Sequence, residues 1–164
     1  MKRIGLISDT HNYLDNAVFK HFDQCDEIWH AGDFGSAMIA DTLRKFKPLR
    51  GVYGNIDGKD IRSEFPEVLS FICEEVKILM IHIGGYPGKY SPVAKAEIVS
   101  HHPKIFISGH SHILKIMYDK KFQCLHMNPG AAGKQGWHKV RTLIRFDIDG
   151  IDIKNCEVIE LGKR

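Results

Sequence analysis

This 164-residue sequence has no closely spaced pair of cysteines, and that absence excludes two classes of protein. The four cysteines, at positions 25, 73, 124 and 156, include no CxxC pair. Thioredoxin-like redox sites and zinc ribbons both depend on such pairs, so neither is present. Each cysteine lies in or beside an apolar stretch, which predicts buried free thiols in a protein of a reducing compartment.

Long apolar runs are also missing. No run approaches the roughly 20 residues that a membrane-spanning helix needs. The basic start at Lys2 and Arg3 is followed by only four residues before polarity returns at Ser8, which is too short for the core of a signal peptide. We therefore expect a cytoplasmic protein with no membrane partner.

Strong charge of either sign is absent. The formal net charge is +3, and no run of lysine and arginine is longer than a pair. This pattern gives no support for a nucleic-acid partner. The sequence also has no repeat, linker or low-complexity stretch, and hydrophobic residues make up 43% of it. Length and composition together predict a single globular domain over residues 1–164.

The apolar patterning predicts an α/β protein. In the first third, expected strands at 4–8, 26–31 and 49–53 alternate with expected helices at 14–24 and 36–46. This βαβαβ order predicts a parallel sheet. Further on, Ser91 and Pro92 form an N-cap signal for one helix of about ten residues. The remaining expected strands are 67–74, 76–83, 104–108, 114–118, 122–127, 140–147 and 151–160. The pattern therefore predicts two packed sheets flanked by helices.

Residues that can bind metals follow these strands, and the sequence has ten histidines to supply them. The residues that end or follow expected strands are Asp9, His11, Asp33, Asn55, His82, His110 and His112. Ligands of open α/β sheets bind outside the carboxyl ends of the strands. We therefore expect these seven side chains to converge on one sheet edge although they are distant in sequence.

The types of these residues point to transition metals. A mixture of carboxylate, imidazole and amide suits Mn²⁺, Fe²⁺, Zn²⁺, Ni²⁺ or Co²⁺, and the absence of thiolates argues against structural zinc. Seven ligands suit two ions if one carboxylate bridges them, and Asp33 is the natural bridge. Each motif alone is weak, since Gly-Asp and Gly-Asn pairs are more often turns than ligands. The specificity lies in the whole set.

This set of motifs resembles a known family. Asp9-Thr10-His11, Gly32-Asp33, Gly54-Asn55-Ile56-Asp57, His82-Ile83-Gly84 and Gly109-His110-Ser111-His112 match the signature of the calcineurin-like metallophosphoesterase superfamily. The short length, and Asn128-Pro129-Gly130 after the last motif, resemble its small YfcE-like phosphodiesterase branch. The resemblance extends from residue 4 to about 147. It implies a four-layer α/β/β/α sandwich of two mixed sheets flanked by helices.

The resemblance also implies an activity, that of a metal-dependent phosphoric diester hydrolase with two divalent transition metals, manganese foremost. Asp9, His11, Asp33 and His112 would hold one ion, and Asp33, Asn55, His82 and His110 the other. A hydroxide bridging the ions would attack a small or exposed phosphodiester in line. By this resemblance Asn55, Asp33 and His82 are the candidate catalytic residues, and Asn55 would stabilise charge on the phosphoryl oxygens.

The sequence departs from the superfamily pattern at Ile56. That position usually carries a histidine close to the leaving group, which is credited as the general acid, and an isoleucine cannot donate a proton. Asp57, His30 and His126 are candidates to hold the ligands in place from behind. We expect His21, His101, His102 and His138 to lie on the surface.

Two other functions stay open. One is a catalytically weak protein-interaction scaffold of the retromer-small-subunit type, although such scaffolds lose ligand residues and this sequence keeps all seven. The other is a phosphomonoesterase or nuclease, and a nuclease should show a basic or aromatic groove. The sequence leaves the oligomeric state open, a homo-oligomer included.

Overall fold

The computed structural model describes residues 1–164, which form two mixed five-stranded sheets. The strands of the first sheet lie in the order β12 (Asp152–Lys163), β11 (Val140–Asp149), β1 (Lys2–Ile7), β2 (Glu27–His30) and β3 (Leu49–Gly51). Those of the second sheet lie in the order β4 (Val68–Cys73), β5 (Val76–Ile81), β8 (Ile105–Ile107), β10 (Cys124–Asn128) and β9 (Lys115–Asp119). A two-stranded hairpin, β6 (Gly85–Tyr86) and β7 (Lys89–Tyr90), lies apart from both.

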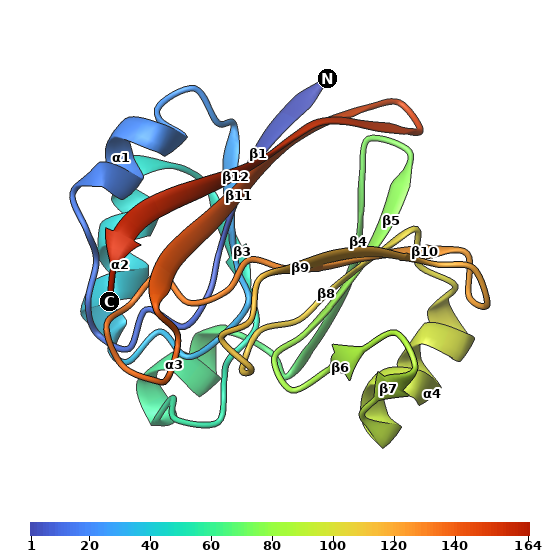
Figure 1. Ribbon diagram of the computed structural model, residues 1–164, viewed down its shortest axis with the longest axis horizontal. Helices are drawn as coiled ribbons and strands as arrows, with labels where there is room; N and C mark the ends of the chain where they lie inside the picture. The colour runs from blue at the N-terminus through green and yellow to red at the C-terminus, as the bar shows by residue number, and fades with distance from the viewer.

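Each sheet contains three neighbouring strands that run parallel to one another. In the first sheet β1, β2 and β3 are parallel, while β11 runs antiparallel to β1. In the second sheet β5, β8 and β10 are parallel, while β4 and β9 are antiparallel edge strands. The carboxyl ends of β1, β5 and their parallel neighbours lie away from the N-terminus (Figure 1). The loops that follow these strands therefore emerge together.

Helices cover the outer faces of both sheets. The helices α1 (Ala17–Phe22) and α2 (Ala37–Phe46) lie outside the first sheet, and α4 (Pro92–His101) lies outside the second (Figure 1). The predicted four-layer α/β/β/α sandwich is therefore confirmed. None of the helices has the length and apolarity needed to span a membrane.

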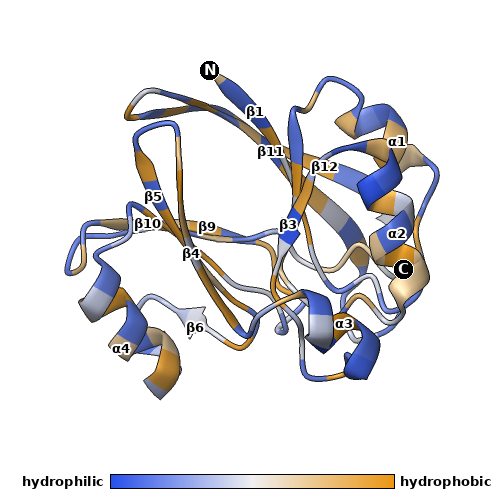
Figure 2. Cartoon of the chain, turned by 180° about the vertical axis from the view of Figure 1, so that it is seen from behind, coloured by the Kyte–Doolittle hydropathy of each residue, from blue (hydrophilic) through white to orange (hydrophobic).

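Three apolar clusters hold the layers together. The space between the sheets is filled by residues such as Leu6, Trp29 and Phe146, all fully buried, with Trp29 and Phe146 in edge-to-face contact at 5.7 Å. Val18 and Phe22 on α1 pack against the outer face of the first sheet. Orange and blue segments alternate along α4 (Figure 2), where Ala94 and Ile98 are buried while Val93 and Val99 are exposed.

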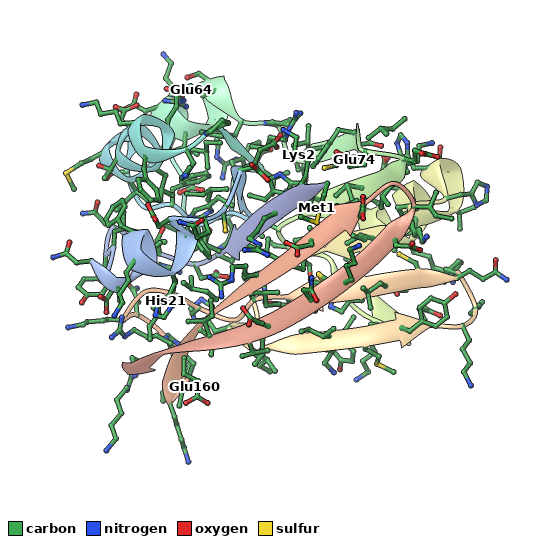
Figure 3. All side chains as sticks on the ribbon, turned by 90° about the horizontal axis from the view of Figure 1, so that it is seen from above. Met1, Lys2, His21, Glu64, Glu74 and Glu160 are labelled. Atoms are coloured by element: carbon green, nitrogen blue, oxygen red, sulfur yellow. The ribbon has the colours of Figure 1, made fainter.

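An ion pair connects the two sheets at the end opposite the loops that follow the parallel strands. The N-terminal ammonium of Met1 lies 3.5 Å from Oε1 of Glu74, which sits in the turn between β4 and β5. Met1, Lys2 and Glu74 gather at this end in the view from above (Figure 3). This ion pair links the first sheet to the second.

The element predictions are largely confirmed, with two differences. Ser91 caps α4 as predicted, because its hydroxyl accepts a hydrogen bond from the backbone N–H of Ala94 at 3.1 Å. The short helix α3 (Lys59–Glu64) was not expected, since its six residues are polar apart from the buried Ile61. The hairpin β6–β7 lies in the segment from Gly84 to Tyr90, where no strand was expected.

Candidate metal centre

The seven candidate ligands lie in the loops after the parallel strands. Asp9 and His11 follow β1, Asp33 follows β2 and Asn55 follows β3, all in the first sheet. In the second sheet His82 follows β5, while His110 and His112 follow β8. The two sheets therefore each supply part of the cluster. The side chains were expected at the edge of one sheet, but they converge where the edges of the two packed sheets meet.

The structure brings these side chains into two adjoining groups. Ligand atoms of Asp9, His11 and His112 lie within 4.8 Å of one another, as do those of Asp33, His82 and His110. Oδ2 of Asp33 lies 3.3 Å from Nε2 of His11 and 3.2 Å from Nε2 of His82. Asp33 therefore lies between the two groups.

The hydrogen bonds of His82 show which of its nitrogens faces the centre. Nδ1 of His82 donates to the backbone oxygen of Ala31 at 2.7 Å, so Nε2 carries the lone pair in the neutral ring. That nitrogen points at Oδ1 of Asn55, 3.1 Å away, and at the Asp33 carboxylate. Three lone-pair atoms thus face one another, an arrangement that a proton or a metal ion would stabilise.

The electrostatics of the centre follow from its buried carboxylates. Burial opposes ionisation of Asp9, but the imidazoles of His11 and His112, whose Nε2 atoms lie 3.9 and 3.1 Å from its Oδ1, outweigh burial when they are protonated and hold the pKa of Asp9 well below its usual range. The pKa of Asp33 is lowered in the same way by the protonated imidazoles of His11 and His82, despite burial. The carboxylates of Asp33 and Asp9 in turn raise the pKa of His11 to about 9. Positive charge is therefore strongly favoured at this point of the fold.

Two buried atoms in the centre have no hydrogen-bond partner. These atoms are Oδ1 of Asp9 and Nε2 of His11, although buried polar atoms are almost always paired. Nε2 of His112 lies 3.1 Å from the same Asp9 oxygen. Carboxylate oxygens and imidazole nitrogens that face inward without donors have the chemistry of ligands for borderline divalent cations, so the residues fit such ions.

The backbone carries strain at most of these positions. Five of the seven residues have a left-handed backbone with φ between 43° and 68°, namely Asp9, His11, Asp33, His110 and His112. This region is uncommon for residues other than glycine and is held only where the surroundings impose it. Strained backbone gathered at one edge of a fold is typical of a functional site.

His30 joins the loops of Asp9 and Asp33 from behind. It is fully buried, and burial lowers its pKa to about 3, so the ring is neutral. Its Nδ1 accepts from the backbone N–H of Gly32 at 3.1 Å, which leaves the proton on Nε2 to be donated to the hydroxyl of Thr10 at 3.0 Å. Thr10 donates onward to the backbone oxygen of Phe34 at 2.9 Å. His30 therefore positions two ligand loops and contacts no ligand side chain.

Asp57 holds the loops of Asp33 and Asn55 together through the backbone. Its buried carboxylate accepts hydrogen bonds from three backbone N–H groups, those of Phe34 at 3.2 Å, Gly35 at 2.9 Å and Gly54 at 2.8 Å. The sequence made Asp57 a candidate to hold the ligands in place, and its hydrogen bonds in the structure go to the main chain of their loops. Charge-assisted bonds of this kind are among the stronger ones in proteins.

The glycines of the motifs allow the loops to approach one another. A Cβ at Gly54 would overlap the backbone nitrogen and carboxylate of Asp33, and one at Gly109 would overlap Oγ of Ser8. Gly109 is held near β10 because its backbone oxygen accepts from Nδ2 of Asn128 at 3.0 Å. The Gly-Asp, Gly-Asn and Gly-His pairs therefore reflect crowding of loops from different strands.

Two further histidines lie where the sequence did not place them. His138, expected on the surface, is half-buried with its ring centroid 5.2 Å from that of His112. Its Nε2 donates to the backbone oxygen of Gly133 at 2.8 Å. His126, a candidate support for the ligands, is buried against Phe106 at a ring separation of 5.6 Å. It makes no hydrogen bond to any of the seven residues.

Comparisons with known proteins identify the family to which the chain is similar. The sequence model of the calcineurin-like phosphoesterase superfamily domain matches residues 1–150. A probable metallophosphoesterase of Methanothermobacter thermautotrophicus is 32% identical over 114 residues, which are 66% of this chain and 66% of that protein. A phosphodiesterase of Methanocaldococcus jannaschii is 27% identical over 148 residues, which are 78% of this chain and 82% of that protein.

Among solved structures, Vps29 of Entamoeba histolytica in complex with zinc has the same fold. The TM-score is 0.74, and the alignment covers 96% of this chain and 98% of the Vps29 chain at 17% sequence identity. A likeness at this identity concerns the arrangement of the sheets alone.

The close approach at Gly54 can be tested by adding one methyl group. We expect Gly54→Ala to lower the free energy of unfolding by about 1–3 kcal/mol, because the Cβ would displace Asp33. Gly58→Ala is the matched control, since a Cβ there meets no atom within 4 Å, and it should change stability by less than about 0.5 kcal/mol. Urea unfolding measures both, and equal effects would contradict the crowding argument.

The raised pKa of His11 predicts that metal binding depends on pH. In the absence of metal, His11 is protonated below about pH 9, and a histidine ligand must be neutral. Binding then releases this proton, so affinity for Mn²⁺ or Zn²⁺ should rise between pH 6.5 and 8.5 by up to tenfold per pH unit. Asp9 and Asp33 are ionised throughout and release none. Calorimetry in buffers of different ionisation enthalpy counts the protons, and a pH-independent affinity would contradict the prediction.

Proposed function

The chain belongs to the calcineurin-like phosphoesterase superfamily, and from this membership we propose that it is a two-metal phosphodiesterase for a small or exposed diester. The observation that carries the proposal is the position of Asp33, whose carboxylate lies between two ligand groups. A carboxylate that lies between two sets of ligands can be shared by a pair of divalent cations, which lie about 3.5–4 Å apart in two-metal sites.

The proposed ligand sets share that residue. Asp9, His11, Asp33 and His112 would hold one ion, and Asp33, Asn55, His82 and His110 would hold the other. We propose Mn²⁺ as the first choice among borderline metals, since the ligands are oxygen and imidazole with no thiolate. When bound, the two ions would supply hydroxide at neutral pH and neutralise charge on the phosphoryl oxygens.

The side chains of the centre have further tasks of their own. Asn55 offers an amide whose Oδ1 faces His82, so its Nδ2 is free to donate to a phosphoryl oxygen. Asp33 is held in place by the backbone N–H of Ile56, which donates to its Oδ1 at 3.0 Å. His82 is fixed by its bond to Ala31. These contacts orient the groups before substrate arrives.

A cavity beside the second ligand group suits one arm of the diester. Its volume is about 340 Å³, and its lining includes Asn55 and His82 together with the apolar side chains of Tyr53, Ile83 and Val93. Arg62 closes one side, lying 4.4 Å from the Tyr53 ring and donating from Nε to the backbone oxygen of Asp57. An apolar wall with an aromatic ring favours an aryl group.

The residue at position 56 supports the same preference. The side chain of Ile56 is exposed and supplies no proton, whereas general acid catalysis typically contributes a factor of about 10²–10⁴. Aryl alcohols leave as stable anions and need little protonation. We therefore propose that the enzyme hydrolyses aryl diesters faster than alkyl diesters.

The scaffold function is the main competing proposal. A Vps29 chain of the same fold binds zinc, so metal binding alone does not separate a scaffold from an enzyme. Turnover separates them. For a nuclease, the net charge of +3 and the single arginine in the cavity offer little to hold a strand.

Hydrolysis of bis-p-nitrophenyl phosphate tests the proposal directly. We expect turnover that requires added Mn²⁺, Ni²⁺ or Zn²⁺ and exceeds that of p-nitrophenyl phosphate. Asp33→Asn and His82→Ala should each lower it by about 100-fold or more, since removing a ligand disrupts the ion. His21→Ala, in the last turn of α1, is the matched control and should retain activity.

Four outcomes of that assay count against the proposal. Turnover without metal, or Asp33→Asn as active as the native protein, would contradict the two-metal mechanism. Faster cleavage of the monoester would favour a phosphomonoesterase. No turnover in a sample that holds two metal equivalents by elemental analysis would favour the scaffold.

The missing proton donor generates a separate prediction. We expect Ile56→His to raise kcat for an alkyl diester by about tenfold or more while changing the aryl rate little, because only the alkyl leaving group needs the proton. Ile56→Gln is the matched control, as it is polar but carries no titratable proton. Alkyl and aryl diesters cleaved equally fast by the native enzyme would contradict the argument.

A further inference from the structure

We propose that a second, smaller cavity beside the metal centre binds an anionic group carried by the substrate. The cavity has a volume of about 170 Å³, and its lining includes Tyr86, Ser111, Lys115, His126 and Asn128. Pockets for drug-sized ligands are about 300–1,000 Å³, so this one suits a small group such as a carboxylate or a phosphate. This inference rests on the proposed phosphodiesterase function.

The position of the cavity relates it to the centre. Ser111 lies between the candidate ligands His110 and His112, and Asn128 holds that loop by donating from Nδ2 to Oγ of Ser111 at 3.1 Å. The hairpin β6–β7, seen beside α4 in Figure 1, supplies Tyr86 to the lining of the same cavity. A group bound there would be joined to the phosphorus by a short chain.

The charge in the cavity is positive and uncompensated. Lys115 forms no ion pair within the chain, and its ammonium lies 4.4 Å from the centre of the Tyr86 ring. No aspartate or glutamate lines the cavity. An ammonium held over an aromatic face without a carboxylate partner is available to an anionic ligand.

The neutral groups in the cavity can donate hydrogen bonds. Oγ of Ser111 already accepts from Asn128 and from the backbone N–H of Ile113 at 3.2 Å, so its own proton is free to be donated. His126 is 1% exposed, and neither of its ring nitrogens has a hydrogen-bond partner. Because buried imidazoles are rarely left unpaired, His126 is an independent sign that a ligand completes the site.

These donors define the class of substrate. One cation and a free hydroxyl proton line a small space that has no competing carboxylate, and the unpaired imidazole of His126 forms part of its wall. We therefore infer a phosphodiester in which the arm that stays on phosphorus ends in a carboxylate or phosphate. The aryl-favouring cavity at Tyr53 would receive the other arm.

A pair of synthetic substrates tests the site. Both are p-nitrophenyl alkyl diesters, and they differ only at the end of the alkyl arm, a carboxylate in one and a carboxamide in the other. For the native enzyme loaded with Mn²⁺ we expect kcat/KM to favour the carboxylate by about tenfold or more, since hydrogen bonds to charged groups contribute on that scale. Lys115→Met should bring the ratio to about one, mainly through KM.

The matched control is Lys120→Met, which removes the same charge in the turn after β9. It should leave the ratio unchanged, so that a general effect of net charge is separated from the contact. A ratio near one in the native enzyme, or a ratio that survives Lys115→Met, would overturn the proposal.

A binding measurement keeps this test separate from the proposed activity. In the zinc-loaded protein, 3-hydroxypropionate should shift the imidazole ¹⁵N signals of His126 to saturation, in native protein and Lys120→Met but not in Lys115→Met. Such shifts without hydrolysis of either diester would refute the proposed function and support the anion site. Hydrolysis of both diesters at equal rates without shifts would refute the anion site alone.

Discussion

Two buried carboxylates that have no lysine or arginine beside them constrain the whole centre. Asp9 and Asp33 are almost fully buried, and their only cationic neighbours are histidines. Burying negative charge without compensation is costly, so the cluster must gain a positive charge from protons or from metal ions. This need for positive charge accounts for the raised pKa of His11, and the inward-facing lone pair of His82 can accept either a proton or a metal ion.

The scaffold behind the ligands works mainly through the main chain. Asp57 accepts hydrogen bonds from three backbone N–H groups of two loops, and His30 is hydrogen-bonded both to the backbone of Gly32 and to the hydroxyl of Thr10. Neither residue touches a ligand side chain. Their bonds instead stabilise left-handed backbone at residues such as Asp33. The backbone conformation of the ligand loops therefore determines where the ligand side chains lie.

The sequence predicted the fold and the clustering of the ligands for one physical reason. Buried parallel strands read as short apolar runs, and polar residues directly after them must meet at a common edge. The same reasoning could not find His138, because it lies in an irregular loop with no periodicity, where only the crowded Gly133 and Gly136 hint at close packing. The helix α3 was missed because six polar residues carry no helical stripe. The role of Asp57 depends on backbone positions that no side-chain pattern encodes.

Neither sheet alone contains either ligand group. Asp9 and His11 belong to the first sheet while His112 belongs to the second, and Asp33 likewise meets His82 and His110 only across the interface. The partners are separated by tens to about a hundred residues of chain, so each group is complete only where the two sheets pack together. Metal ions would therefore bind the assembled sandwich in preference to the unfolded chain and would stabilise the packing of one sheet on the other by mass action.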